Sequence, residues 1–348
     1  FVFGVFAPRV MIRGAAAIKA LRNPWLYGAA KPVQEKAEKK PVDFVSLRKK
    51  FLTFSACLMA VILLCAAVFG VHLDTEFTGG AMITLSYEGS FDQAAVQKTA
   101  AAALENTGLT LQTGENVATG DQTLKISMPG TETVTTEQVE NLLDSLNENY
   151  PDNQFTQLSL SNVSAAMGTK FLQKSLVAVL FALVLILLYI ALRFKNIGGL
   201  TGGMMAVLAL VNDLMVVFGT FVLLRTPLDG NFIAAMLTIL GYSINDTVVI
   251  YDRIRENSAL YGKKQMSLAE LVNLSVNQSF ARSLMTSITT CLALGVVCVV
   301  SVIYRLDSIY SFAFPLLFGM VSGVYSTICI ATPLWVDWKN KKKAAKKA

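Results

Sequence analysis

"LGYSINDTVVIYDRIREN", residues 240–257, places an amide and a carboxylate, Asn245 and Asp246, in a run that is otherwise apolar enough to cross a membrane. A charge near the bilayer centre costs about 2.5 kcal/mol or more, so it is retained where a partner or a function offsets that cost. Asp246 follows the start of this run at Phe232 by roughly 21 Å of helix. The sequence therefore predicts a spanning helix with a buried acid on the inner side of the midplane.

The composition indicates that this helix is one of several. Hydrophobic residues make up 53% of the 348 residues and charged residues only 16%, compared with roughly 25% charged residues in a soluble domain. About 20 apolar residues are enough to cross the hydrocarbon core as a helix. Six such runs are present, at residues 51–71, 175–192, 199–224, 232–251, 284–303 and 309–335. We expect six transmembrane helices, the first of them not a cleaved signal peptide.

Charge is distributed unevenly along the chain, and this distribution predicts the topology. Residues 72–173 hold 13 acidic and 3 basic residues, whereas the whole chain has a net charge of +6. Most of the basic residues lie before the first run, after the second, between the fourth and fifth, and in the tail "KNKKKAAKKA". The positive-inside rule makes that side cytoplasmic, with both termini, and makes 72–173 extracytoplasmic. The charge is explained by topology, so we expect contact with membrane lipid and none with nucleic acid.

The extracytoplasmic segment has the pattern of a small folded domain. Four alternating runs and two helical ones are predicted in the order βαββαβ, with Thr135 and Gln138 as a capping box at the second helix. This is the order of a ferredoxin-like α+β domain. The segment has neither a nucleophile paired with a base nor a glycine-rich phosphate loop, and we interpret it as a binding or lever domain, not an enzyme.

Cysteine and histidine give no sign of a disulfide framework or a metal site. All five cysteines lie in the spanning runs, and none lies in the exported segment. His72 is the only histidine and has no cysteine near it in the sequence, so we expect an interfacial residue. We predict no metal and no bound cofactor.

Glycine-rich stretches mark the expected joints between helices and domain. "EFTGG", Glu76, Phe77, Thr78, Gly79 and Gly80, links the first helix to the first strand, and its glycines permit positive φ or a close backbone approach. "NIGGLTGG" at 196–203 and the pair Gly319 and Gly323 have the small-residue spacing of close helix packing. "SLAELVNLSV" at 267–276 has the pattern of an amphipathic helix lying at the cytoplasmic face.

Polar residues inside the spanning runs form the candidate site, a proton relay. On the fourth helix Thr238, Gly241, Asn245 and Asp252 share one stripe, with Asp246 beside it. Such a stripe is expected to face protein or a water-filled cavity. The remaining candidates are Asp213 near the middle of the third helix and Arg282 at the start of the fifth. One alternative is that Asp246 or Asp213 is a static lock, that is, a buried ion pair or hydrogen bond that only holds the bundle together. The other is that Arg282 only flanks the membrane.

These motifs resemble the SecF family. "GYSINDTVVIYDRIREN" is similar to the family signature in the fourth helix, with Tyr251 where Phe is usual, and "EFTGG" resembles "DFTGG", with Glu76 as the acid. "NQSFARSLMTSITT" resembles the fifth helix, while "LVNDLMVV" has Asn212 where the family often has His. "NPWLYG" at 23–28 resembles the tail of SecD, so the chain looks like the SecF half of a fused SecD–SecF protein.

The resemblance implies the following organisation: a SecD-like tail at 1–30, a basic linker at 31–50, the first helix at 51–71, the exported domain at 72–173, five helices at 174–338 with a cytoplasmic loop at 252–283, and a basic tail at 339–348.

The resemblance also implies a function in the bacterial plasma membrane. SecD and SecF together are similar in helix architecture to resistance–nodulation–division exporters and assist late translocation of preproteins by the Sec channel and its motor ATPase. Proton flow is expected to move the exported domains, with Asp246 carrying the proton and Arg282 modulating it. The alternatives are a half-exporter of lipids or small molecules and a passive translocon scaffold.

Overall fold

The computed structural model describes residues 42–106, 108–115, 121–130 and 133–345. The SecD-like tail and most of the basic linker predicted from the sequence lie outside these ranges. Six helices in the described part are long and apolar enough to span a membrane. They are α2 (Arg48–Phe69), α6 (Ala165–Arg193), α7 (Gly199–Leu224), α8 (Gly230–Gln265), α9 (Leu268–Ile303), and α10 (Asp307–Ser326), which continues through a π-helix (Thr327–Ala331) into α11 (Thr332–Ala345).

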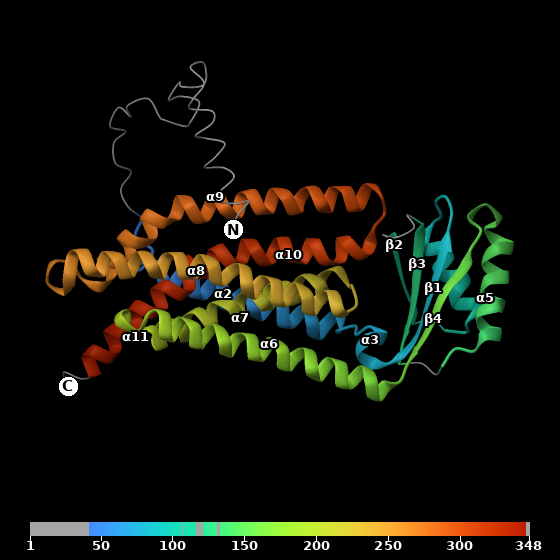
Figure 1. Ribbon diagram of the computed structural model, residues 1–348, viewed down its shortest axis with the longest axis horizontal. Helices are drawn as coiled ribbons and strands as arrows, with labels where there is room; N and C mark the ends of the chain where they lie inside the picture. The colour runs from blue at the N-terminus through green and yellow to red at the C-terminus, as the bar shows by residue number, and fades with distance from the viewer. Residues whose placement is uncertain (1–41, 107, 116–120, 131–132, 346–348) are drawn as a thin grey trace, which may run out of the picture. The chain divides into compact units, whose positions relative to one another are not determined.

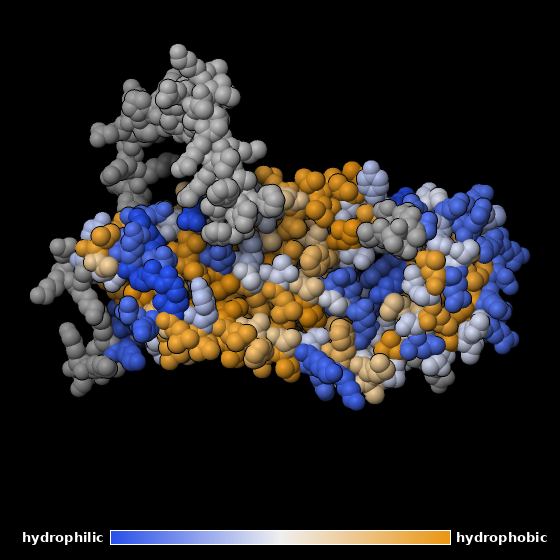
Figure 2. Space-filling model, in the orientation of Figure 1, coloured by the Kyte–Doolittle hydropathy of each residue, from blue (hydrophilic) through white to orange (hydrophobic). Residues whose placement is uncertain are grey.

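The six long helices run alongside one another (Figure 1). α7 and α10 bury most of their surface, whereas α2, α6 and α9 expose large apolar side chains such as Leu64, Leu180 and Leu292. Figure 2 shows hydrophobic surface over the middle of the helices and hydrophilic surface beyond it. This distribution is that of a multi-pass membrane protein.

The segment predicted to be exported, between the first two spanning helices, forms a four-stranded antiparallel sheet with two helices; we call it the exported domain. The elements, in chain order, are β1 (Gly80–Tyr87), α4 (Gln93–Ala103), β2 (Thr110–Glu115), β3 (Gln122–Pro129), α5 (Thr136–Asn149) and β4 (Thr156–Val163). The strand order across the sheet is β2-β3-β1-β4, with Ile83 opposite Ile126 in the central pair. The buried side chains of β1 alternate with half-buried ones, and they pack with Val96 of α4 and Val139 of α5 into one core.

The segment at 252–283, predicted to be a cytoplasmic loop, is helical over nearly all of its length. α8 continues to Gln265 and α9 begins at Leu268, so only Met266 and Ser267 lie between the two helices. The segment 267–276 is therefore the first part of α9, not a separate surface helix. A Ser267–Glu270 capping box starts α9, and the Asn257 amide donates to the Ser275 hydroxyl at 2.8 Å. Hydropathy marks where a helix leaves the bilayer, but these polar contacts allow it to continue into water.

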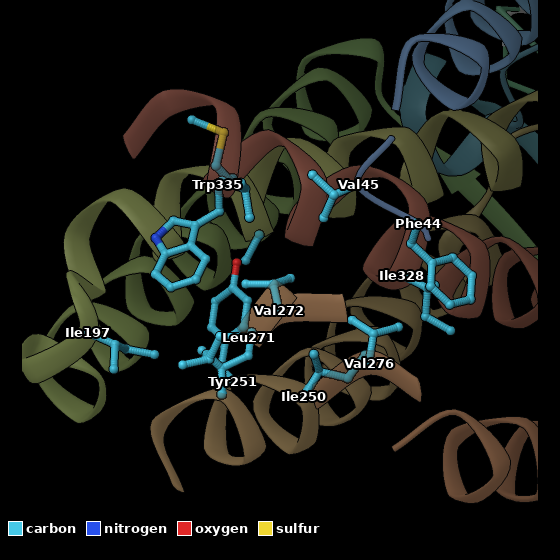
Figure 3. Packing of buried hydrophobic residues seen from close by; sticks show 14 of the residues in the cluster. Phe44, Val45, Ile197, Ile250, Tyr251, Leu271, Val272, Val276, Ile328 and Trp335 are labelled. Carbon is cyan, nitrogen blue, oxygen red and sulfur yellow. The ribbon is translucent and has the colours of Figure 1, made fainter. Parts of the chain in front are cut away.

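The end of the bundle that the charge pattern makes cytoplasmic has a packed core (Figure 3). Tyr251 and Trp335 are almost completely buried there with their rings 6.0 Å apart. The Tyr251 hydroxyl donates to the Gly202 carbonyl at 3.0 Å, and a Cβ on Gly202 would lie only 3.2 Å from the Tyr251 ring. The predicted glycine spacing thus corresponds to close packing, here of α7 against α8.

Candidate functional site

Asp246 of α8 is buried against α9, and one oxygen of its carboxylate is unsatisfied in the described chain. The residue is 5% exposed, and its Oδ2 has no hydrogen-bond partner among the described residues. The Ser283 and Ser287 side chains of α9 face this carboxylate, but no hydrogen bond of normal geometry reaches Oδ2 or the Ser283 hydroxyl in the described chain. Arg282 is exposed and interacts electrostatically with Asp246, but no ion pair joins them in the described structure. An unpaired buried polar atom is costly and calls for an explanation.

Asp213 is enclosed in a different environment. It is fully buried and accepts hydrogen bonds from three serine hydroxyls, Ser243 of α8 at 2.7 Å and Ser322 and Ser326 of α10 at 2.6 and 2.7 Å. Asn212 donates to Ser322 at 3.2 Å. Both carboxylate oxygens are thus satisfied, and Asp213 joins α7, α8 and α10 as a lock would. The structure does not bring Asp213 together with Arg282 in any ion pair among the described residues.

The polar stripe of α8 divides into two parts. Thr238, Gly241 and Asn245 are exposed on the described surface, where Asn245 lines a shallow groove of about 430 Å³ with Tyr189 of α6. Asp252 lies two turns beyond Asn245 and pairs with Arg255 at 2.6 Å and Arg193 at 3.3 Å. Both Asp252 and its partners are more than a third exposed, so these pairs contribute little free energy. Asn245 therefore faces outward in the described chain, and Asp252 is engaged in surface pairs.

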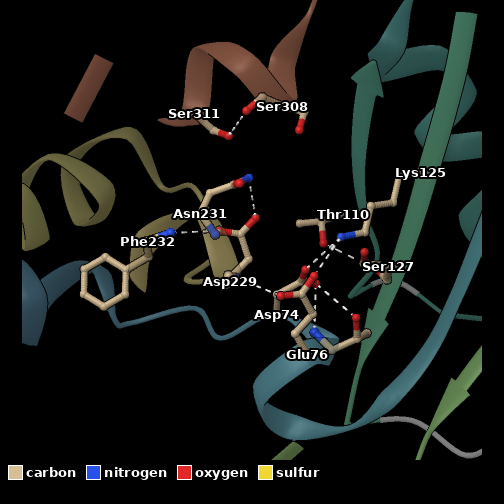
Figure 4. A network of polar contacts seen from close by, with 12 residues as sticks. Asp74, Glu76, Thr110, Lys125, Ser127, Asp229, Asn231, Phe232, Ser308 and Ser311 are labelled. Carbon is tan, nitrogen blue, oxygen red and sulfur yellow. Dashed lines mark hydrogen bonds and ion pairs between the residues drawn. The ribbon is translucent and has the colours of Figure 1, made fainter. Parts of the chain in front are cut away.

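The "EFTGG" stretch forms a joint that connects the sheet to the start of α8 (Figure 4). Thr75–Thr78 form the short helix α3, and Gly79 and Gly80 have φ of +79° and +135°. Glu76 accepts the Gly230 N–H at 2.8 Å, and Leu73 bridges to Leu228 in parallel. The joint is thus attached directly to the helix that carries Asp246.

A group of carboxylates surrounds this joint. Asp74 is 1% exposed, and Lys125 of β3 lies 3.5 Å from Asp74 and 3.6 Å from Glu76. Asp229 is 3% exposed and caps α8 by accepting the N–H groups of Asn231 and Phe232. Burial raises the pKa of Asp229 to about 6, and the charges of Glu76 and Asp74 add to this rise.

Sequence reasoning missed Asp74, Lys125, Asp229 and the serine donors to Asp213. The acids Asp74 and Asp229 stand next to helix starts, which was an available signal. Ser322 and Ser326 have the i, i+4 spacing that places two hydroxyls on one helix face. Lys125 gave no signal, because only the folded sheet brings β3 to the joint.

Residues 142–341 match the family model described as protein export membrane protein SecD/SecF, C-terminal. The chain is 32% identical to protein translocase subunit SecF of Alicyclobacillus acidocaldarius over 307 residues, 87% of this chain and 96% of that relative. The identity to SecF of Petrotoga mobilis is also 32%, covering 88% and 99%. Protein translocase subunit SecDF of Bacillus subtilis is 31% identical over 86% of this chain and 38% of its own length.

Two solved structures of SecDF proteins are also similar to this chain. The crystal structure of SecDF from Thermus thermophilus, a translocon-associated membrane protein, has a TM-score of 0.70 at 29% identity and covers 87% of this chain and 39% of that one. SecDF in its super-membrane-facing form has a TM-score of 0.62 at 30% identity, covering 89% and 40%. With six apolar helices, a small antiparallel sheet and the buried acids on helices that the family model covers, the chain is a multi-pass membrane protein that belongs to the SecF family of protein translocase subunits.

Proposed function

We propose that this chain uses the proton-motive force to assist late steps of preprotein export, as a non-enzymatic subunit without a bound cofactor. Its membership of the SecF family gives the role in protein export. The observation that carries the proton coupling is Asp246, a carboxylate buried among the spanning helices whose Oδ2 lacks a hydrogen-bond partner in the described chain. A carboxylate in such a place is stabilised by taking up a proton, and moving the Arg282 charge relative to it changes its proton affinity.

The proposed partners follow from the relatives. SecDF proteins carry SecD and SecF in one chain, and we assign a SecD half, fused or separate, as the direct partner. The Sec channel with its motor ATPase, the emerging preprotein and membrane lipid complete the set. We place the protein in a bacterial plasma membrane with both termini cytoplasmic, in accord with the positive-inside rule.

We assign the exported domain to the ferredoxin-like class and give it the role of a lever. The assignment is supported by its element order and by the strand order β2-β3-β1-β4. Asp213 is a lock that keeps α7, α8 and α10 in register, because its oxygens are satisfied by three hydroxyls.

Asp246→Asn tests the proton-carrier role. The variant keeps the size of the side chain but does not titrate, so we expect normal assembly with a SecD half and loss of gradient-stimulated export in proteoliposomes. Glu256→Gln, at a surface pair on the same helix, is the matched control and keeps the stimulation. Asp213→Asn is expected to reduce stimulation less than Asp246→Asn and to affect assembly more.

Two results would contradict the proposal. One is normal gradient-stimulated export by Asp246→Asn. The other is loss of export only because Asp246→Asn no longer assembles, which would make Asp246 a static lock.

A further inference from the structure

The exported domain touches the helices at a second place besides the "EFTGG" joint. The turn between α9 and α10 contacts β2, and elsewhere along this edge Gln93 and Gln97 of α4 donate to the Leu111 and Leu109 carbonyls. The Thr113 N–H donates to the Asp307 carboxylate at 3.3 Å. The Thr113 hydroxyl lies 3.0 Å from the same carboxylate and within hydrogen-bonding distance of the Arg305 carbonyl oxygen. We call Thr113, Arg305 and Asp307 the latch.

The latch has the features of a specific contact. Thr113 is only 5% exposed, although it lies on an edge strand. Arg305 has a φ of +55°, a conformation that costs free energy for a residue with a side chain. In this conformation its guanidinium donates to the Phe91 carbonyl of the exported domain at 3.1 Å. The turn is thus held in an uncommon shape by contacts with the domain that it touches.

Beside the latch, a cleft separates the exported domain from the turn between α9 and α10. Its volume is about 870 Å³, and it is lined on one side by Tyr87, Phe91 and neighbouring residues of the domain and on the other by Tyr304 and Arg305. A cleft of this size means that the domain does not rest on a broad packed interface here. The latch residues bridge it, so breaking a few hydrogen bonds would free this side of the domain.

The helix that begins at the latch, α10, also reaches the buried Asp213. α10 begins at Asp307, and its Ser322, about 22 Å further along the helix, donates to Asp213. A Cβ on Gly319 would lie only 2.7 Å from Ile239 of α8 and from Val217 of α7. α10 is therefore packed too tightly against α7 and α8 to stay still when those helices shift.

We infer that α10 couples the buried membrane site to the exported domain, with Thr113 and Asp307 as the positioning residues that make the connection. This rests on the proposed proton-driven function and deepens it. A shift of α8 on proton uptake or release moves α10, and the latch transmits that movement to β2. The "EFTGG" joint is then the pivot, and the latch is the point at which the domain is pulled.

The test compares Thr113→Val with Thr113→Ser in the complete protein with its SecD half in proteoliposomes. Val keeps the shape of Thr and removes the hydroxyl, whereas Ser keeps the hydroxyl. Three quantities are measured: export driven by ATP alone, its stimulation by a proton gradient, and proton conductance. Loss of a hydrogen bond to a charged group lowers the ratio of closed to open latch populations by roughly tenfold. We expect Thr113→Val to lose most of the stimulation and keep proton conductance and ATP-driven export, and Thr113→Ser to retain all three.

Thr110→Val is the matched control, because Thr110 is on the same strand and its hydroxyl donates within the sheet, to the Ser127 carbonyl, with no other partner among the described residues. A double-mutant cycle adds a readout that a general loss of stability does not produce. Asp307→Ala removes the acceptor of both the Thr113 N–H and the Thr113 hydroxyl, so the double variant Thr113→Val, Asp307→Ala is expected to be no worse than Asp307→Ala alone.

The outcomes separate this inference from the proposed function. If Thr113→Val keeps full stimulation while Asp246→Asn loses it, the inferred role of the latch is wrong and the role of Asp246 as proton carrier is retained. If Asp246→Asn keeps full stimulation, the proposed function fails and the coupling fails with it. If Thr113→Val and Thr110→Val lose stimulation equally, or if the effects of Thr113→Val and Asp307→Ala add, the residues act on sheet stability and the inference is overturned.

Discussion

At the residue scale, the buried acids differ in how their charge is satisfied. Asp213 accepts three hydroxyl groups, whereas one oxygen of Asp246 accepts none in the described chain. Asp229, outside the spanning runs, accepts two backbone N–H groups at the start of α8 and lies near two other acids. Burial depth alone therefore does not define a role, because the hydrogen-bond partners decide which charge state each site favours.

Asp229 is expected to make the stability of the protein depend on pH. Its folded-state pKa is raised to about 6 from 3.8, so the folded protein binds this proton more tightly than the unfolded chain. Protonation of Asp229 therefore adds to the free energy of unfolding at pH 5, and this contribution is lost as the pH rises through 6. The free energy of unfolding falls by about 1 kcal/mol between pH 5 and pH 7. Asp229→Asn keeps a good helix cap but does not titrate.

Thermal unfolding of the purified protein at the two pH values measures this contribution. The difference between pH 5 and pH 7 should shrink in Asp229→Asn and stay unchanged in Asp144→Asn, which alters an exposed acid of α5. An equal pH difference in the wild type and Asp229→Asn would show that Asp229 does not titrate in this range.

At the element scale, short local signals start the helices of both parts of the protein. Thr135 and Gln138 form a capping box at α5, and Ser267 and Glu270 form one at α9. In each box a side chain accepts one of the free N–H groups of the first turn. The box at α9 explains why that helix begins at Leu268, well before its long apolar run at 284–303.

Thr135→Ala is expected to destabilise the exported domain by about 1 kcal/mol. The measurement is urea unfolding of a fragment of residues 80–165 followed by circular dichroism, in which we expect one cooperative transition with mixed helix and strand signal. Thr136→Ala, one residue further on, is the control, because Thr136 makes no cap. Equal urea midpoints for the two variants would show that the capping box contributes nothing to the stability of the domain. A fragment without a cooperative transition would show that the domain needs the transmembrane helices to fold.

At the scale of the whole molecule, charge and hydropathy together predict the orientation of the chain in the membrane. Ser90 lies in the exported segment and Ala259 on the part of α8 that extends past the predicted inner surface, and both are exposed. In a cysteine-free background, we expect an impermeant maleimide to label Ser90→Cys in intact cells and Ala259→Cys only after permeabilisation. Equal labelling of both positions in intact cells would contradict the predicted topology.

The sequence by itself determined the spanning helices and the elements of the domain between the first two of them. Each of these depends on a local pattern: about 20 apolar residues for a span and alternation for a strand. The extension of α8 and α9 past the membrane was missed, because polar contacts such as that between Asn257 and Ser275 join residues that sequence spacing does not relate.

Only the tertiary structure decided which polar groups meet. Asp213 is satisfied by Ser243, Ser322 and Ser326, residues up to 113 positions away. Arg282 makes no ion pair with Asp246 in the described chain, although their stripes predicted that it could reach one. Helical periodicity gives the face on which a side chain lies, but the rotation and offset of each helix against its neighbours follow from packing at residues such as Gly319. A hydrogen bond depends on tenths of an ångström, and only the packed bundle fixes distances that closely.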